Sequence, residues 1–232
     1  MLTVRKSDER GVTRIGWLDS KHTFSFGEYY DPAHHHYRAL RVINDDKING
    51  GGGFDPHPHR DMEILTYVLS GALRHQDSMG NGSVIRPGDW QKMSAGTGIV
   101  HAEFNDSDDV PVHLFQIWIV PNEKGLTPTY DQKSYPEAER LGKWQVAASQ
   151  DGRDGSIVVH QDVTLSAAKV RPGDRLDYDL APGRGAWVQV ATGAVTINGT
   201  KLTAGDAVAV EGEPHIVVVG EADGEVLLFD LG

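Results

Sequence analysis

Residues 63–71 read Glu63-Ile-Leu-Thr-Tyr-Val-Leu-Ser-Gly71, and this stretch carries the pattern that decides the fold class. Aliphatic, β-branched and aromatic residues run together for about the length of one strand, and Ser-Gly then ends the run. The same pattern recurs at residues 112–120, 186–191, 195–198, 215–219 and 225–230. Helical periodicity is weak throughout, and the best short helix candidate is residues 134–141, where Pro136 and acidic residues suit a first turn. The sequence therefore predicts an all-β fold, either a barrel or a sandwich.

One strand-turn-strand pattern occurs twice along the chain. Tyr67-Val-Leu-Ser-Gly71-Ala-Leu73 is followed by Arg86-Pro-Gly-Asp89, and Val188-Gln-Val-Ala-Thr-Gly193-Ala-Val195 is followed by Thr203-Ala-Gly-Asp206. Repetition of such a unit predicts two related β-barrels. The turn-rich stretch between residue 121 and about residue 143 is where the two would join. We therefore expect an N-terminal barrel at residues 1–132 and a C-terminal barrel at residues 133–232.

Composition excludes several classes of function. The 232 residues include 22 Lys and Arg against 33 Asp and Glu, a formal net charge of −11, with no cluster of basic residues. Direct binding to nucleic acid or to an anionic membrane is therefore disfavoured. There is no cysteine, so any metal must be held by imidazole and carboxylate. The N-terminus is charged from its fifth residue and no stretch is apolar enough to span a membrane, so we expect a cytoplasmic protein.

Two short motifs place metal-binding side chains on shared strand faces. Residues two apart in an extended strand point the same way, so His57 and His59 should project together, and so should His101 and Glu103. If the two strands are neighbours, three imidazoles and one carboxylate converge, a set that suits a borderline divalent transition metal. A single His-x-His pair is most often incidental, but a second His-x-Glu some forty residues on strengthens the metal prediction. Because side chains alternate between the two faces of a strand, Glu63 can also point inward. Together with His57, His59, His101 and Glu103 it makes five candidate ligands.

The spacing of these residues resembles cupin motifs. Gly51, His57, His59, Glu63 and Gly71 follow the first cupin motif with one extra residue before its last Gly. Gly98, His101 and Asn105 resemble the end of the second motif, whose usual Pro is replaced by Gly96-Thr-Gly98.

The sequence is more specifically similar to the pirin family. The matching stretches are Trp17-Leu-Asp-Ser20, His22-Thr-Phe-Ser-Phe26, Tyr30-Asp-Pro32, Leu40-Arg-Val-Ile-Asn-Asp-Asp46, His57-Pro-His-Arg-Asp-Met-Glu63, His75-Gln-Asp-Ser78, Met93-Ser-Ala-Gly-Thr-Gly-Ile99, Gln116-Ile-Trp-Ile119 and His160-Gln-Asp162. This resemblance implies a bicupin, each barrel made of two antiparallel sheets, in which only the N-terminal barrel binds metal. It also implies that the ligands are His57, His59, His101 and Glu103. Glu63 would then be a neighbour of the ligands or a structural acid, because two carboxylates and three imidazoles would crowd one cation.

Other residues have plainer interpretations. Adjacent residues of an extended chain cannot all face one point, so His34, His35 and His36 are expected in a solvated loop. The remaining histidines lack a ligand pattern: His75, His113, His160 and His215. An aromatic-rich stretch that contains Trp17, Phe24, Phe26 and Tyr30 should pack in a core, and one or two of its side chains could line a substrate pocket. Alignment of the two repeats puts Asp179, Ala181 and Val218 where His57, His59 and His101 stand, so the second barrel should lack a metal.

The pirin resemblance implies an enzymatic function. Bacterial members are associated with quercetin 2,3-dioxygenase activity, which cleaves a flavonol with uptake of O2 and release of CO. Glu103 would act as both ligand and general base, and the single metal ion is expected to be Fe(II), with Mn, Co, Ni, Cu or Zn as alternatives. One alternative function is a non-enzymatic, redox-sensing regulatory protein that binds a protein partner. A second is another cupin reaction on a different metabolite, since cupins carry many chemistries.

Overall fold

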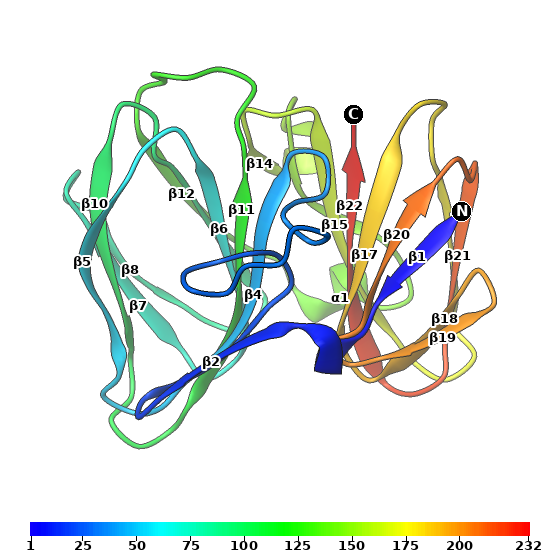
Figure 1. Cartoon of the computed structure of the whole chain (residues 1–232), viewed down its shortest axis with the longest axis horizontal. Helices are drawn as coiled ribbons and strands as arrows, with labels where there is room; N and C mark the ends of the chain where they lie inside the picture. The colour runs from blue at the N-terminus through cyan, green and yellow to red at the C-terminus, as the bar shows by residue number, and fades with distance from the viewer. The chain divides into compact units, whose positions relative to one another are not determined.

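β-Strands make up nearly all the regular structure of the computed structural model, which describes residues 1–232 (Figure 1). Helical segments are confined to the single turns η1 (Ser7–Glu9), α1 (Glu137–Arg140) and η2 (Arg153–Gly155). α1 falls within the predicted helical segment, directly after Pro136, whose fixed φ suits a helix start. No helix is long and apolar enough to cross a membrane. The all-β prediction is confirmed.

The chain forms two compact units. The first unit is residues 11–134, and the second unit combines residues 1–10 with residues 135–232. The first ten residues therefore differ from the expected division at residue 132, because β1 (Leu2–Arg5) pairs antiparallel with β20 (Ala207–Glu211). Leu2 and Val4 pack against the core of the second unit. Figure 1 shows this pairing as the dark-blue arrow beside the orange strand β20.

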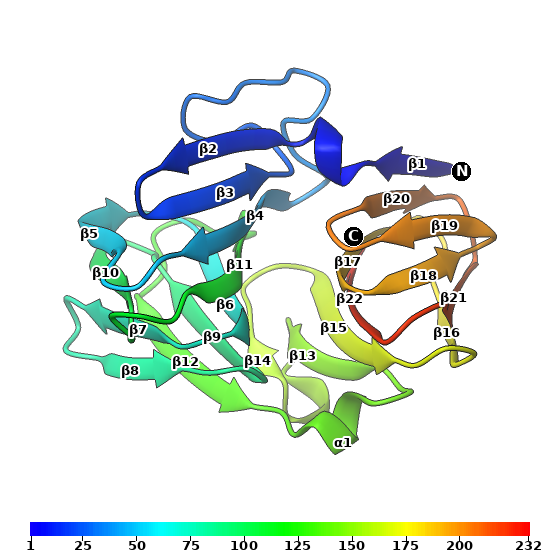
Figure 2. The ribbon, with the colours of Figure 1, turned by 90° about the horizontal axis from the view of Figure 1, so that it is seen from below.

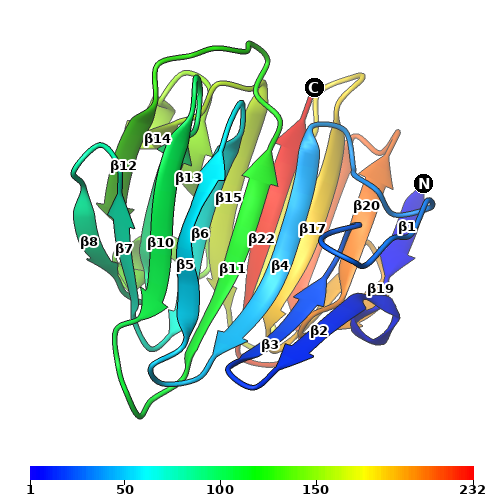
Figure 3. The ribbon, with the colours of Figure 1, turned by 60° about the vertical axis from the view of Figure 1, so that its left-hand side comes forward.

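Two antiparallel sheets form the first unit (Figures 2 and 3). The seven-stranded sheet has the order β12 (Thr129–Ser134), β9 (Asp89–Ser94), β6 (Glu63–Ser70), β11 (Val112–Ile119), β4 (Leu40–Ile48), β3 (Leu18–His22), β2 (Gly11–Ile15). The four-stranded sheet has the order β5 (Gly53–His59), β10 (Ile99–Asn105), β7 (Leu73–Asp77), β8 (Gly82–Ile85). The two sheets face each other and enclose the barrel interior (Figure 1).

The second unit repeats this arrangement. Its seven-stranded sheet has the order β1, β20, β17 (Gly185–Thr192), β22 (Gly224–Leu231), β15 (Val163–Val170), β13 (Gln145–Ser149), β14 (Ile157–Val158). Its four-stranded sheet has the order β16 (Arg175–Asp179), β21 (His215–Gly220), β18 (Ala194–Ile197), β19 (Thr200–Thr203). All neighbours are antiparallel except β13 and β14.

The strand orders of the two units correspond one to one. The run β9-β6-β11-β4 matches β20-β17-β22-β15, and β5-β10-β7-β8 matches β16-β21-β18-β19. Gly71 and Gly193 occupy equivalent turns with φ of +76° and +74°, a conformation that favours glycine. The repeat seen in the sequence is therefore a repeat of barrel topology.

The interiors of the two barrels differ in polarity. The second unit has one continuous apolar core, which includes Leu176, Val188, Val218 and Leu228. The first unit includes two smaller apolar clusters, one around Ile48 and Leu114 and the other around Ile64 and Met93, and it also buries polar side chains such as Asp46. The polar interior of the first barrel is where a functional site can form.

Candidate metal centre

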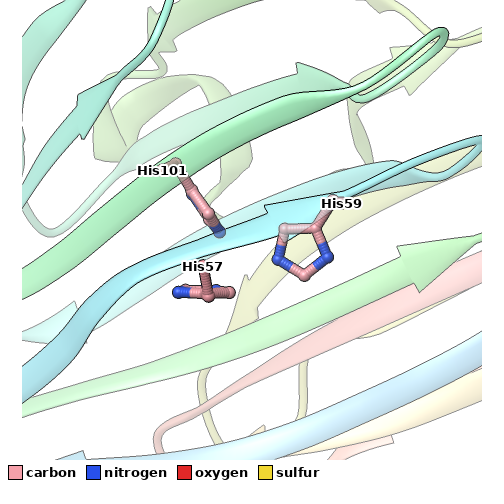
Figure 4. Close-up of side chains that lie close together, drawn as sticks. All are labelled: His57, His59 and His101. Carbon is pink, nitrogen blue, oxygen red and sulfur yellow. The ribbon is translucent and has the colours of Figure 1, made fainter.

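Three histidines meet between β5 and β10 of the first unit. The two strands pair antiparallel with His57 opposite His101, and His59 lies on the same face of β5 as His57. Their ring centroids are 4.8 Å apart for His57 and His59, 4.5 Å for His57 and His101, and 4.8 Å for His59 and His101. One nitrogen from each ring lies within 4.8 Å of the others. Figure 4 shows the three imidazoles gathered in one place from the two strands.

The surroundings of the histidines suit metal ligation. His57 Nδ1 lies 2.7 Å from the carbonyl oxygen of Asp55, which can only accept, so Nδ1 donates and Nε2 is the nitrogen available to bind a metal ion. Burial, together with the neighbouring imidazoles, lowers the pKa of His59 to about 4 and that of His101 to about 3. Neutral imidazole is the form that binds a metal ion.

Glu103 follows His101 by two residues on β10 and is 3% exposed. Its Oε2 accepts a hydrogen bond of 2.9 Å from Gln116 Nε2, and its Oε1 accepts one of 3.3 Å from Thr66 Oγ1. Its carboxylate belongs to a second close group of donors, formed with His75 and His101, rather than to the group of three histidines. Both groups share His101.

Glu63 lies outside both groups of donors. It is 1% exposed, and its Oε2 accepts a hydrogen bond of 3.0 Å from Ser94 Oγ. Lys92 Nζ donates to the same Ser94 oxygen at 2.8 Å. Glu63 does not line the cavity described below. Its contacts are those of a buried structural acid.

His75 is the residue of this region that sequence reasoning missed. It is fully buried on β7, where it pairs with Glu103, and its ring centroid lies 5.3 Å from that of His101. His75 Nε2 lies 3.4 Å from Asp77 Oδ2, and His75 Nδ1 has no hydrogen-bond partner. The sequence contains His75-x-Asp77, which places two possible ligands on one face of a strand. Their closeness to His101 follows only from the pairing of β7 with β10, which the sequence does not reveal.

A cavity of about 550 Å³ opens over the metal centre, within the size range of small-molecule sites. All four expected ligands line it. Its apolar wall is formed by Ile15, Leu18, Phe26, Phe54 and Trp118, and its polar lining includes Thr13, Ser20, His22, Asn44, Asp46 and Gln116. The cavity can therefore enclose a flat apolar ligand that carries polar groups.

The aromatic residues of the N-terminal stretch divide between core, cavity and surface. Phe26 lines the cavity and meets Trp118 edge to face, with centroids 5.4 Å apart. Trp17 packs edge to face against Phe54 at 5.0 Å, and Phe24 is buried. Tyr30 is 73% exposed. Of these four aromatic residues, only Phe26 lines the cavity.

The remaining histidines serve local roles. His34 Nδ1 lies 2.8 Å from Asp31 Oδ2, while His35 and His36 are exposed, and none of the three lines the cavity. Two further histidines pair with carboxylates at 2.6 Å: His113 with Asp45, and His215 with Asp179.

The place that corresponds to the metal centre in the second unit is apolar. Val218, aligned with His101, is fully buried, and its partner across the sheet is Leu176. The register therefore assigns Leu176 to the place of His57, where the alignment of the sequence repeats had put Asp179. Asp179 instead pairs with His215 at the exposed end of the strands.

The donors of the first unit fit a transition metal. Three imidazoles with a nearby carboxylate suit Fe, Mn, Co, Ni, Cu or Zn, and leave positions open for water or substrate. The fit rests on the close approach of the three rings, two of which are held neutral by burial.

Sequence comparison agrees with this architecture. The model of the Pirin family matches residues 3–119, and the model of the quercetinase C-terminal cupin domain matches residues 146–231. The chain belongs to the pirin family. The quercetin 2,3-dioxygenase of Escherichia coli (strain K12) is 50% identical over 231 residues, which cover 100% of this chain and 99% of that protein.

Solved structures of a pirin extend the comparison to the fold. The crystal structure of YhhW from Escherichia coli superposes with a TM-score of 0.96 at 49% identity, covering 100% of this chain and 98% of that chain. The structure of bacterial pirin YhhW in complex with nickel(II) gives a TM-score of 0.95 at 49% identity, with 100% and 99% covered. The bicupin fold expected from the pirin resemblance is confirmed.

Proposed function

We propose that this pirin is a metal-dependent dioxygenase that cleaves a flavonol such as quercetin, taking up O2 and releasing CO. The observation that carries the proposal is the convergence of His57, His59 and His101 at a cavity with aromatic walls. The full-length similarity to a protein named quercetin 2,3-dioxygenase supports the same substrate class.

In this proposal the three histidines and Glu103 hold one metal ion, which we expect to be Fe(II). A bound transition metal would supply Lewis-acid polarisation and electron exchange with dioxygen. The histidines contribute neutral donors whose positions are fixed by β5 and β10.

Glu103 is the proposed general base. It would accept the proton of the flavonol 3-hydroxyl, and the two hydrogen bonds from Gln116 and Thr66 hold its carboxylate in one orientation. Each carboxylate oxygen keeps a further lone pair for this purpose. Phe26, Phe54 and Trp118 would pack against the flat rings and exclude water from the reacting end.

The test is oxygen-dependent loss of quercetin. Purified, iron-loaded protein should bleach the flavonol absorbance in air and not under nitrogen. His59→Ala should lower the rate at least about 100-fold, since changes to residues behind the ligands already cost 10–100-fold in metalloenzymes. His36→Ala removes an exposed histidine outside the cavity and should leave the rate unchanged. Loss of quercetin at equal rates in wild type and His59→Ala would contradict the proposal.

Metal content separates catalysis from the regulatory alternative. Elemental analysis of protein from its native host should find iron, and His101→Ala should lose the metal while keeping the circular dichroism of a β protein. Extensive unfolding of His101→Ala would instead assign the metal a structural role. A protein that holds iron yet consumes no quercetin would favour the redox-sensing regulatory function, which acts through a protein partner.

A further inference from the structure

Four polar side chains form a wall of the cavity that the metal centre does not use. Ser20 and His22 on β3 stand opposite Asp46 and Asn44 on β4, and all four line the cavity. We call these four residues the polar wall. Each is at most 3% exposed, and none belongs to a group of close metal donors. The polar wall lies on the seven-stranded sheet, whereas the three histidines lie on the four-stranded sheet. The two sheets of this unit face each other (Figure 1).

The hydrogen bonds of the polar wall leave one group unsatisfied. His22 Nε2 lies 2.8 Å from Thr13 Oγ1, and His22 Nδ1 lies 2.8 Å from Asn44 Oδ1. Asp46 is hydrogen-bonded by Ser20, but its Oδ1 has no partner in the protein. Burial, reinforced by the negative charges of Asp45 and Glu103, raises the pKa of Asp46 to about 7. A buried carboxyl group with an unused oxygen is costly and needs a compensating role.

The second barrel provides an internal comparison for Asp46. In the first unit Leu114 pairs with Asp46 on one side and Val68 on the other. In the second unit Val226 stands at the matching place, between Ala168 and Val190. The counterpart of Asp46 is therefore Ala168, which is fully buried in an apolar core. The barrel fold accepts an apolar residue here, so folding alone does not account for Asp46.

We propose that the polar wall binds a hydroxyl group of the aromatic substrate and that Asp46 is its main hydrogen-bonding residue. This inference rests on the proposed function and specifies the substrate class as an aromatic compound with hydroxyl groups at more than one place. One hydroxyl reaches the metal centre and Glu103, while another meets Ser20, His22, Asn44 and Asp46. The apolar residues between them, such as Leu18 and Phe54, contact the ring system. Asp46 is thus a specificity-determining residue.

The test compares two flavonols in equilibrium binding without oxygen. Quercetin carries hydroxyls on all its rings, whereas 3-hydroxyflavone keeps only the hydroxyl assigned to Glu103. Metal-loaded wild type should bind quercetin about tenfold more tightly than 3-hydroxyflavone, as expected for one hydrogen bond to a buried group. Asp46→Ala should abolish this preference by weakening quercetin alone, and Asp46→Asn should retain part of it. Asp46→Ala introduces the residue type that the second barrel carries at the matching place, Ala168, so we expect folding to be preserved.

Asp19→Ala is the matched control. Asp19 neighbours Ser20 on β3, but it is exposed, its carboxylate bonds Arg14, and it does not line the cavity. This substitution should leave both affinities and the metal content unchanged.

The outcomes separate this inference from the proposed function. An Asp46→Ala variant that loses affinity for both flavonols equally, or that keeps the quercetin preference, would overturn the role of the polar wall even if the wild type turns over quercetin. A preference that depends on Asp46 without oxygen-dependent turnover would uphold the polar wall and reject the dioxygenase. Wild type that binds neither flavonol would overturn both.

Discussion

Asp46 is the residue whose chemistry is most strongly altered by its surroundings. Its carboxyl group is 3% exposed and close to two other acids, so it keeps its proton to a pKa of about 7, far above the usual value near 3.8. Burial is the largest cause of this shift, and the hydrogen bond from Ser20 opposes it only in part. The neutral form is therefore the form that fits the folded protein.

The stability of the protein should report this shift. The unfolded chain ionises Asp46 near pH 3.8, whereas the folded protein does so near pH 7. The stabilising contribution of protonated Asp46 is thus fully present below pH 3.8 and is lost as pH rises through 7. Asn at this position cannot ionise, so the Asp46→Asn variant does not lose stability in this way. Relative to wild type, its free energy of unfolding should therefore rise by up to about 3 kcal/mol between pH 4 and 7. Chemical denaturation at several pH values measures this, and a pH-independent difference would refute the shifted pKa.

The candidate ligands illustrate what a sequence can reveal at the level of single residues. The two-residue period of a strand was sufficient to place His57 with His59 and His101 with Glu103. It could not show that Glu103 groups with His75, because that contact depends on β7 lying next to β10. The polar wall escaped notice for the same reason, since Ser20 and Asp46 face each other only when β3 and β4 pair.

At the level of elements, the two equivalent hairpin turns explain the repeat. Gly71 and Gly193 both have positive φ, and a Cβ at Gly193 would lie 2.2 Å from the carbonyl oxygen of Asp223. The turn therefore requires glycine for its conformation and also for its close approach to the backbone. The same short turn in both barrels made the repeat visible in the sequence, whereas loops with looser requirements diverged.

Gly193→Ala should consequently be much more damaging than a change at an open turn. Gly183 also has positive φ, +84°, but a Cβ there would meet nothing within 4 Å. Gly183→Ala should cost about 1 kcal/mol from backbone strain alone. Gly193→Ala adds a backbone clash and should cost at least about 3 kcal/mol. Equal losses in thermal denaturation of the two variants would show that the close approach at Gly193 is relieved at little cost.

At the level of the whole molecule, the second unit is completed by the start of the chain. β1 adds the edge strand next to β20, and Lys6 Nζ lies 2.9 Å from Asp206 Oδ2 at the end of this pairing. Repeated motifs predicted two related barrels, and turn composition predicted a join between residue 121 and about residue 143; the first unit of the structure ends at residue 134. The position of β1 was not, because Leu2 and its partner Val210 lie at opposite ends of the sequence and no local pattern links them.

A substitution in β1 should weaken the second unit and spare the metal centre. Val4 is half-buried against the second core, so Val4→Asp should lower the unfolding free energy by about 2 kcal/mol through burial of a charge. Thr3→Asp, at an exposed neighbouring position, is the control and should have little effect. Metal content should stay at the wild-type level in both variants, since every expected ligand lies in the first unit. Calorimetry and elemental analysis check the two statements, and equal destabilisation by both variants would argue against the packing role of Val4.

The pairing of β1 with β20 also constrains the order of events during synthesis. β1 is synthesised about 200 residues before its partner strand, which contains Val208 and Val210. All the strands of the first unit are available long before then, so that barrel can fold while the second is still being translated. Leu2 and Val4 must remain unpaired for the same period, exposed to other nascent chains. Residues 5–10, which directly follow, include five charged side chains. These charges would oppose aggregation of β1 before it pairs with β20.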